Sequence, residues 1–133
     1  MNYKVEYNGD LRTTAIHIKS GEQVITDAPT DNNGQGRYFS PTDLTSASLA
    51  SCMMTIVGIN ASNHGITIES MSAEVIKKMA SNPRRIEAIQ INLSISAHEL
   101  DEKQKEILSR AARTCPVAMS LHPDINQDVQ ITF

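Results

Sequence analysis

Apolar and polar residues alternate along the first part of this chain, and this pattern predicts short, half-buried β-strands. Residues 3–7 alternate strictly, and the Asn, Gly and Asp at 8–10 then predict a turn. Residues 11–19 and 24–27 are expected to form a hairpin, because a Ser-Gly pair between them can reverse the chain. The Pro, Asp, Asn and Gly of residues 28–36 predict a loop after this hairpin.

Strand patterns return in the second half of the chain. Residues 66–79 and 86–96 are rich in isoleucine, and apolar side chains alternate strictly over 89–95. These two segments are predicted to be long antiparallel strands joined at Ser81-Asn82-Pro83. A last strand is predicted over 129–133, where Val, Ile and Phe alternate with polar residues.

A long helix is predicted between the two groups of strands. Ser40-Pro41-Thr42-Asp43 combines a capping Ser, a Pro at the first helical position and an acidic residue three positions after the cap. The helix is expected to run to about Asn63, just ahead of Gly65. Its middle, from Ala47 to Ile59, is apolar on nearly every side, and such a helix must be covered all round. One small sheet cannot provide that cover, so we expect a homodimer.

A second helix is predicted from near Asp101, where Gln104 stands in the capping-box position. Pro116 would end this helix and begin a short one that reaches Leu121. The apolar face of the second helix would carry Leu108, Ala111, Ala112 and Cys115. Strands and helices together predict an α+β fold, and 133 residues suffice for a single domain spanning residues 1–133.

Composition and charge limit the partners of this protein. Apolar residues make up 40% and charged residues 20% of the chain, which is typical of globular proteins. The formal net charge is -3 and the 12 Lys and Arg are scattered, so we expect no nucleic-acid partner and no membrane partner. The apolar run 44–59 is too short to span a bilayer, and residues 1–10 lack the apolar stretch of a signal peptide. A cytoplasmic location is therefore expected.

The chain contains only two cysteines, Cys52 and Cys115. A structural disulfide is not expected in a reducing compartment, and their separation excludes a Cys-x-x-Cys motif. Two interpretations stay open: each cysteine packs in the core as a small apolar residue, or the two form a redox pair. The four histidines show no ligand spacing with either cysteine, so no metal site is predicted.

Arg12 is the charged residue that favours the redox interpretation. In a strand over 11–18, Arg12 shares its face with Thr14, Ile16 and Ile18, and that face is the apolar one. An inward-facing guanidinium needs an anion, and a thiolate would serve, with a lowered cysteine pKa as the result. The other interpretation is that Arg12 begins the strand at its rim and extends to water.

Three motifs resemble those of one family. Residues 39–52, from Phe39-Ser40-Pro41 to Ser51-Cys52, resemble the helix that carries the first cysteine in the OsmC/Ohr family of osmotically inducible and organic hydroperoxide resistance proteins. Thr114-Cys115-Pro116-Val117 is similar to the second cysteine motif of that family. Gly9-Asp10-Leu11-Arg12 resembles its arginine-bearing segment. The resemblance extends over essentially the whole chain.

This resemblance implies an OsmC-like α+β fold with a six-stranded antiparallel sheet arrangement and two central helices. It also implies an intertwined homodimer with active sites at the subunit interface. Cys52 would match the peroxidatic cysteine, Cys115 the resolving cysteine and Arg12 the activating arginine. No cofactor is implied, because an external dithiol, with a lipoyl-type dithiol as a candidate, would reset the cysteine pair.

One position departs from the family pattern. Many members carry a Glu after the Pro, where this chain has Thr42, and that Glu holds the arginine. Asp43 is one residue late and suits helix capping instead. We therefore expect Arg12 to lack a bidentate partner and to be less ordered, with faster turnover in Thr42→Glu. Thr42 would lie on the substrate side of the site, together with an apolar pocket formed by Met53, Met54, Ile56 and Met119.

The leading hypothesis is a cysteine-based peroxidase. It would reduce organic hydroperoxides, and hydrogen peroxide as a second substrate, through a Cys52 sulfenic acid and a Cys52–Cys115 disulfide. Two alternatives stay open: a thiol redox sensor or binding protein without efficient turnover, and a purely structural dimer. The sequence also leaves open whether Arg12 and Cys52 meet within one subunit.

Overall fold

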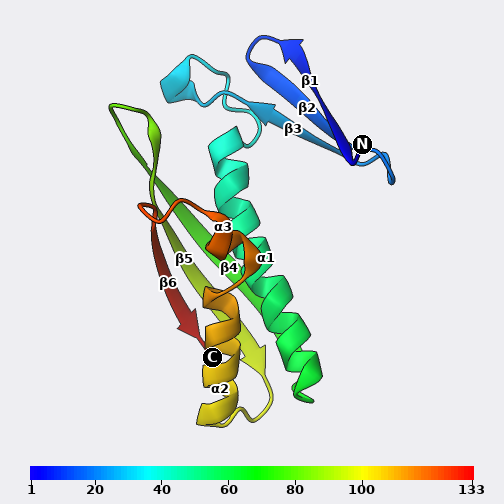
Figure 1. Ribbon diagram of the computed structural model, residues 1–133, viewed down its shortest axis with the longest axis vertical. Coiled ribbons are helices and arrows are strands. Elements are labelled where there is room, and N and C mark those ends of the chain that lie inside the picture. Colours follow the sequence, from blue (N-terminus) through cyan, green and yellow to red (C-terminus); the bar gives the residue numbers. More distant parts are fainter. The chain divides into compact units, whose positions relative to one another are not determined.

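The computed structural model describes residues 1–133, and the contacts within the chain divide it into two compact units, Met1–Thr45 and Ser46–Phe133. Each unit contains one three-stranded sheet, and helix α1 (Pro41–Asn63) begins in the first unit and continues through the second (Figure 1). The α+β class is confirmed. The expectation of a single domain stays a prediction.

The first unit contains strands β1 (Tyr3–Gly9), β2 (Arg12–His17) and β3 (Gln23–Asp27), which pair antiparallel in that order. Asp10 and Leu11 both have positive φ, 52° and 60°, at the β1–β2 turn. Left-handed backbone at two consecutive residues is the geometry of a type I′ hairpin turn, which suits the twist of the flanking strands. The predicted strands are confirmed, and the loop that follows contains a short 3-10 helix, Thr30–Asn32.

Helix α1 begins where the sequence predicts it. The Asp43 backbone N–H donates to Ser40 Oγ at 3.1 Å, and the Ser40 backbone N–H donates to Asp43 Oδ2 at 2.9 Å. These reciprocal bonds satisfy two donors that a helix start leaves without helical partners. The helix ends at Asn63, and Gly65 then takes a positive φ of 66°.

The second unit contains strands β4 (Ile68–Ala80), β5 (Arg85–Ala97) and β6 (Asn126–Thr132) in one sheet. Helices α2 (Glu102–Arg113) and α3 (Pro116–Ser120) connect β5 to β6. The predicted capping box at Asp101 is present, since its side chain accepts from the Gln104 backbone and the Gln104 side chain accepts from the Asp101 backbone.

The expected six-stranded antiparallel arrangement is wrong for the chain as it stands. The strands form two separate three-stranded sheets, and β6 runs parallel to β5. The physical reason is the connection between β5 and β6. Helices α2 and α3 carry the chain back to the end of the sheet where β5 begins, so β6 runs in the same direction as β5. The short helix predicted after Pro116 is present as α3, in addition to the two longer helices α1 and α2.

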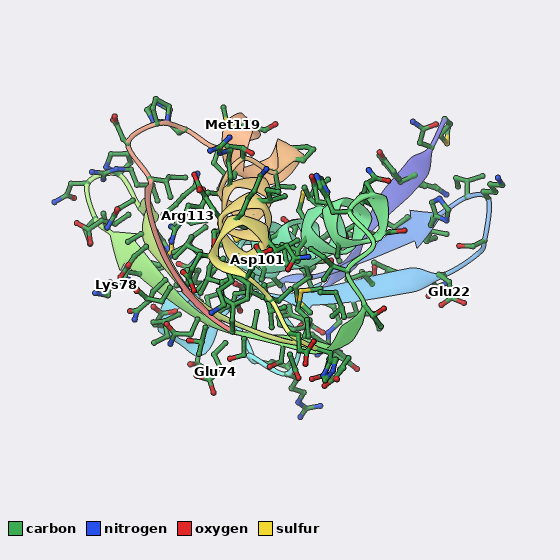
Figure 2. The ribbon with its side chains drawn as sticks, turned by 90° about the horizontal axis from the view of Figure 1, so that it is seen from below. Glu22, Glu74, Lys78, Asp101, Arg113 and Met119 are labelled. Carbon is green, nitrogen blue, oxygen red and sulfur yellow. The ribbon has the colours of Figure 1, made fainter.

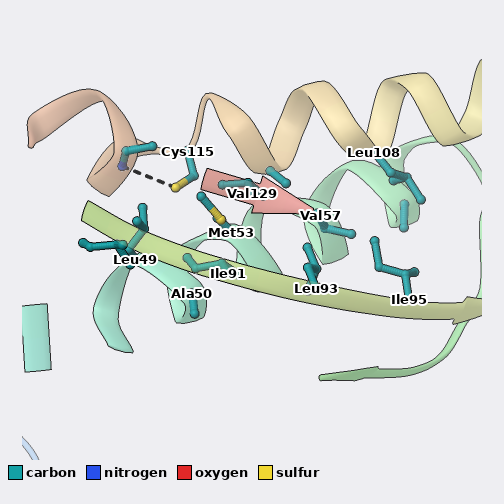
Figure 3. Close-up of a cluster of buried hydrophobic side chains, with 14 of the residues drawn as sticks. Leu49, Ala50, Met53, Val57, Ile91, Leu93, Ile95, Leu108, Cys115 and Val129 are labelled. Atoms are coloured by element: carbon teal, nitrogen blue, oxygen red, sulfur yellow. Dashed lines mark hydrogen bonds between the residues drawn. The ribbon is translucent and has the colours of Figure 1, made fainter. Parts of the chain in front are cut away.

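The core of the second unit lies between its sheet and its helices (Figure 3). Figure 2 shows the helices on one face of the curved sheet. Strand β5 turns its alternating apolar residues toward them, and α1 and α2 supply the facing side chains. The apolar residues with 2% or less of their surface exposed are Leu49, Met53, Val57, Ala61, Ile89, Ile91, Leu93, Ile95, Leu108, Ala112 and Cys115.

Helix α1 is long and apolar enough, by length and composition alone, to cross a membrane. The argument that the apolar run 44–59 is too short therefore does not hold for the whole 23-residue helix. The core helix of a soluble protein passes the same test, and α1 places Leu49, Met53 and Val57 in the core of the second unit.

Candidate functional site

The fold brings together the two cysteines that lie 63 residues apart in the sequence. Cys52 occupies the middle of α1, and Cys115 is the N-cap residue of α3. The Val117 backbone N–H donates to Cys52 Sγ at 3.5 Å, and the Ala118 N–H donates to Cys115 Sγ at the same distance (Figure 3). Both cysteines are free thiols. The first turn of α3 thus contacts both sulfur atoms.

The two thiols differ in their surroundings. Cys115 is fully buried, with 0% of its surface exposed, whereas Cys52 is half-buried. Burial raises the pKa of Cys115, and the side-chain hydrogen bond with Cys52 raises it further, against the opposing effect of the Ala118 N–H. Cys115 is therefore a neutral thiol at physiological pH. Cys52 is the more exposed of the two residues.

Local sequence explains the position of Cys115. Pro116 stands at the first position of α3, where its fixed φ suits a helix start and its missing N–H leaves no donor without a partner. The side-chain amide of Gln127 on β6 donates to the Ala118 carbonyl at 2.9 Å and ties α3 to the sheet. Sequence analysis missed Gln127. Gln127 alternates with Val129 and Ile131 along β6, so its polar side chain lies on the core face of the strand. This polar position in an apolar series is the signal that could have revealed it.

A second cluster, around the charged residue Arg12, lies within the first unit. The Arg12 Nε and Nη2 donate to Oδ1 and Oδ2 of Asp27 at 2.7 and 2.9 Å. The guanidinium carbon lies 4.8 Å from the centre of the Tyr38 ring, within cation–π range. The hydrogen bond to Asp27 raises the pKa of Arg12, and the same bond lowers the pKa of Asp27. Both groups are therefore charged at physiological pH.

The expectation that Arg12 lacks a bidentate partner is wrong. Asp27 provides the carboxylate that Thr42 cannot, because the β2–β3 register places residues 12 and 27 directly opposite each other. The predicted hairpin already paired these two segments, so a register assignment could have found Asp27. With 28% of its side chain exposed, Arg12 is also not a rim residue that extends freely to water.

The residues expected on the substrate side lie in different environments. Thr42 is at the start of α1, with its Oγ1 3.2 Å from Ser40 Oγ. Met53 is fully buried in the core, and its place in the expected pocket stays a prediction. Met119 is on the surface, with 71% of its area exposed.

A groove of about 280 Å³ lies between α1 and α2, and its lining includes residues close in sequence to the two cysteines. One of its residues, Ile56, is one helical turn after Cys52, and another, Thr114, directly precedes Cys115. Arg110 in its wall is paired with Glu106. The groove is lined by Ile56, Asn60, Ile107, Arg110, Ala111 and Thr114.

The structure therefore brings Cys52 together with Cys115, and Arg12 together with Asp27. Arg12 belongs to the first compact unit and the cysteine pair to the second. The pairing of Arg12 with the Cys52 thiol stays a prediction.

The chain as a whole is similar to known proteins. The family model described as OsmC-like protein matches residues 34–130. A Psychrobacter arcticus 273-4 structure, provisionally named an osmotic stress induced and detoxification response protein, is 53% identical with a TM-score of 0.93. That match covers 98% of this chain and 95% of the other. No curated protein matches.

More distant structures share the fold. A Legionella pneumophila organic hydroperoxide resistance protein OsmC is 15% identical with a TM-score of 0.74, over 100% of this chain and 98% of the other. The organic hydroperoxide resistance protein OhrB of Bacillus subtilis is 17% identical with a TM-score of 0.64, over 99% and 98%. The family match spans well over half of the chain and contains both cysteine motifs. The chain belongs to the OsmC-like family.

Proposed function

We propose that this protein is a thiol peroxidase that reduces organic hydroperoxides with Cys52 and Cys115. The observation that carries the proposal is the meeting of two free thiols of unequal burial at the start of α3. A core-packing role would explain one buried cysteine, but it does not explain a half-buried thiol held against a fully buried one. Two relatives named for organic hydroperoxide resistance support the same reaction class.

Cys52 is the nucleophile in this proposal. It is the more exposed of the two thiols, and its sulfur accepts the Val117 N–H, a bond that grows stronger when the sulfur is negatively charged. Cys115 has the raised pKa of a buried thiol, so it stays protonated and does not compete for the peroxide. The resolving role suits such a thiol.

The reaction proceeds in three balanced steps. The Cys52 thiolate attacks one peroxide oxygen, the O–O bond breaks, and the departing alkoxide takes a proton to leave as an alcohol. Cys52 is then a sulfenic acid. The Cys115 sulfur attacks it, the S–O bond breaks, and water leaves as the Cys52–Cys115 disulfide forms. An external dithiol is oxidised in turn and returns both cysteines to thiols, and a lipoyl-type dithiol is our candidate.

The groove between α1 and α2 supports an organic rather than a purely inorganic peroxide. Its apolar residues Ile56, Ile107 and Ala111 offer contact to an alkyl group. Hydrogen peroxide has no apolar part, so it gains nothing from these contacts. We therefore expect kcat/KM to be higher for an alkyl hydroperoxide than for hydrogen peroxide.

The peroxidase is favoured over a redox sensor because of the Arg12 cluster. The sensor interpretation rested on the missing carboxylate at Thr42, and Asp27 supplies a carboxylate to the arginine. With Arg12 fixed by two charge-assisted bonds, the reason to expect inefficient turnover disappears.

A cytoplasmic homodimer belongs to the same proposal. In the first unit, Tyr3, Val5 and Tyr7 of β1 are each exposed over more than 60% of their area. In the second unit, α1 leaves half of Ile59 exposed. Apolar surface of this kind marks an interaction site, and a second copy would cover it. Light scattering should then give about twice the chain mass of 14.6 kDa, and a stable monomer would contradict the dimer.

The test of the function combines a thiol count with turnover. One equivalent of cumene hydroperoxide should remove two free thiols from the reduced wild-type protein, because the first oxidation leads to a disulfide. Continuous peroxide consumption with dihydrolipoamide should follow. Loss of two thiols without turnover would indicate a redox sensor rather than an enzyme. No loss of thiols would indicate a purely structural role.

A further inference from the structure

Gln127 is a part-buried polar residue on β6, and its side chain bonds to the short helix that contacts both thiols. Its backbone pairs with Ile89, a fully buried residue of the central strand β5. Its side-chain amide donates to the Ala118 carbonyl at 2.9 Å. An amide placed among apolar side chains needs such a partner, because a buried polar group without a hydrogen bond is costly. The bond therefore fixes α3 to the sheet.

The end of α3 explains why the Ala118 carbonyl accepts a side chain. The last bond of this helix runs from the Leu121 N–H to the Val117 carbonyl at 3.2 Å. The backbone is then extended at Leu121, with φ -73° and ψ 153°. The chain thus leaves the helix before a further N–H reaches the Ala118 carbonyl, which is one of the acceptors that a helix end leaves open. Gln127 supplies the missing donor from another element.

Ala118 bonds to the cysteine pair through its other backbone group. Its N–H donates to Cys115 Sγ at 3.5 Å (Figure 3), and the N–H of the preceding residue, Val117, donates to Cys52 Sγ at the same distance. Ala118 is itself buried, with 8% of its surface exposed. One peptide segment therefore connects the Gln127 amide to both sulfur atoms, and a shift of this segment would move Cys115 relative to Cys52.

We propose that Gln127 is a positioning residue, which holds the first turn of α3 so that Cys115 can close the disulfide with Cys52. This inference rests on the proposed function, in which that disulfide follows the oxidation of Cys52. Gln127 touches neither sulfur nor the peroxide. It acts through Ala118, and all four residues belong to the second compact unit.

Closing the disulfide depends on position more than the first attack does. A small solute adopts its own orientation at Cys52, whereas Cys115 approaches Cys52 Sγ only from the place that α3 gives it. The two side chains already hydrogen-bond to each other, so the folded chain holds them in contact. A misplacement of ~1 Å between reacting groups can cost about a hundredfold in rate. Loss of the Gln127 bond should therefore slow closure selectively.

Dithiodipyridine measures the two steps separately and without a peroxide. The Cys52 thiolate attacks one sulfur of this probe, the S–S bond of the probe breaks, and one thiopyridone leaves. Cys115 then loses its proton to solvent and attacks Cys52 Sγ, so that the disulfide forms and the second thiopyridone leaves. The absorbance of thiopyridone should rise in two phases in reduced wild-type protein, and in the first phase alone in Cys115→Ser.

Gln127→Met is the central variant, and Gln130→Met is its matched control. Met keeps the length of the side chain and suits an apolar face, but it has no N–H to donate. Gln130, on the same strand, loses only an exposed bond to Asp128. We expect the second phase to slow tenfold or more in Gln127→Met, with the first phase within about threefold of wild type. Both phases should stay within about twofold of wild type in Gln130→Met.

Gln127→Glu keeps the test decisive if Gln127→Met does not fold, which circular dichroism checks. Its ionised carboxylate has nearly the shape of the glutamine amide but only accepts hydrogen bonds, so it cannot bond the Ala118 carbonyl. The same selective slowing is expected. A folded variant whose second phase is as fast as that of wild type would overturn the proposal, and so would equal slowing of both phases. Wild-type protein that shows both phases but consumes no peroxide would overturn the proposed function alone.

Discussion

The two clusters of this protein are assembled in different ways. Arg12 and Asp27 are 15 residues apart and meet because one hairpin pairs them in register. Cys52 and Cys115 meet because α3 starts against the middle of α1, after two long strands and a second helix. The first cluster depends on a local ladder, and the second depends on the packing of a whole unit. A substitution in one cluster should therefore leave the packing of the other cluster intact.

The largest expected effect comes from the cysteine pair. Cys52→Ser should abolish peroxide reduction, because a hydroxyl is a far weaker nucleophile than a thiolate near neutral pH. Cys115→Ser should allow the first oxidation and then stall at the Cys52 sulfenic acid. A dimedone adduct at Cys52 in the Cys115→Ser protein, measured by mass spectrometry, checks this. Equal first-step rates in wild type and Cys52→Ser would contradict the assignment.

Arg12→Met tests whether the hairpin cluster acts on the thiol pair. If Arg12 stabilises the Cys52 thiolate, its loss should slow both alkylation of Cys52 and peroxide attack near pH 7, by about tenfold for each ~1.4 kcal/mol of thiolate stabilisation that is lost. The measurement is the pH profile of alkylation at Cys52, with Arg113→Met as a control on an exposed arginine. A profile identical to that of wild type would show that Arg12 does not act on the Cys52 thiol.

Gln127→Ala tests the anchor of α3. The Gln127 amide bonds the Ala118 carbonyl, and removing a part-buried bond of this kind lowers the free energy of unfolding by about 1 kcal/mol. Gln130→Ala on the same strand is the control, because its partner Asp128 lies in an exposed pair. Urea unfolding measures both. A loss as large in Gln130→Ala would show that the bond to α3 is not the cause.

The smallest expected effect is an acid dependence of the hairpin unit. The folded pKa of Asp27 lies below its ordinary value of 3.8, so the stability from its ionisation is complete above that value. It is lost as the pH falls through the folded pKa. The difference in unfolding free energy between wild type and Asp27→Asn should therefore be constant above about pH 5 and shrink below pH 4. A difference that grows in acid would have the wrong sign.

Much of the fold could be predicted from local pattern. The start of α1 at Pro41, its end at Asn63 and the capping box at Asp101 follow from residues within a few positions of one another. The three antiparallel pairs of consecutive strands follow from alternation and turn residues. Such features need no information from distant parts of the chain, since a cap or a strand period is satisfied by near neighbours.

The sequence by itself determined the elements, the two cysteine motifs and the family to which they point. Only the tertiary structure decided that β6 runs parallel to β5, that the start of α3 meets Cys52, and that Cys115 is fully buried while Cys52 is half-buried. The physical reason is that direction, partner and burial are properties of two or more segments at once. They are set by packing and register across the chain, which the pattern of a single segment does not contain.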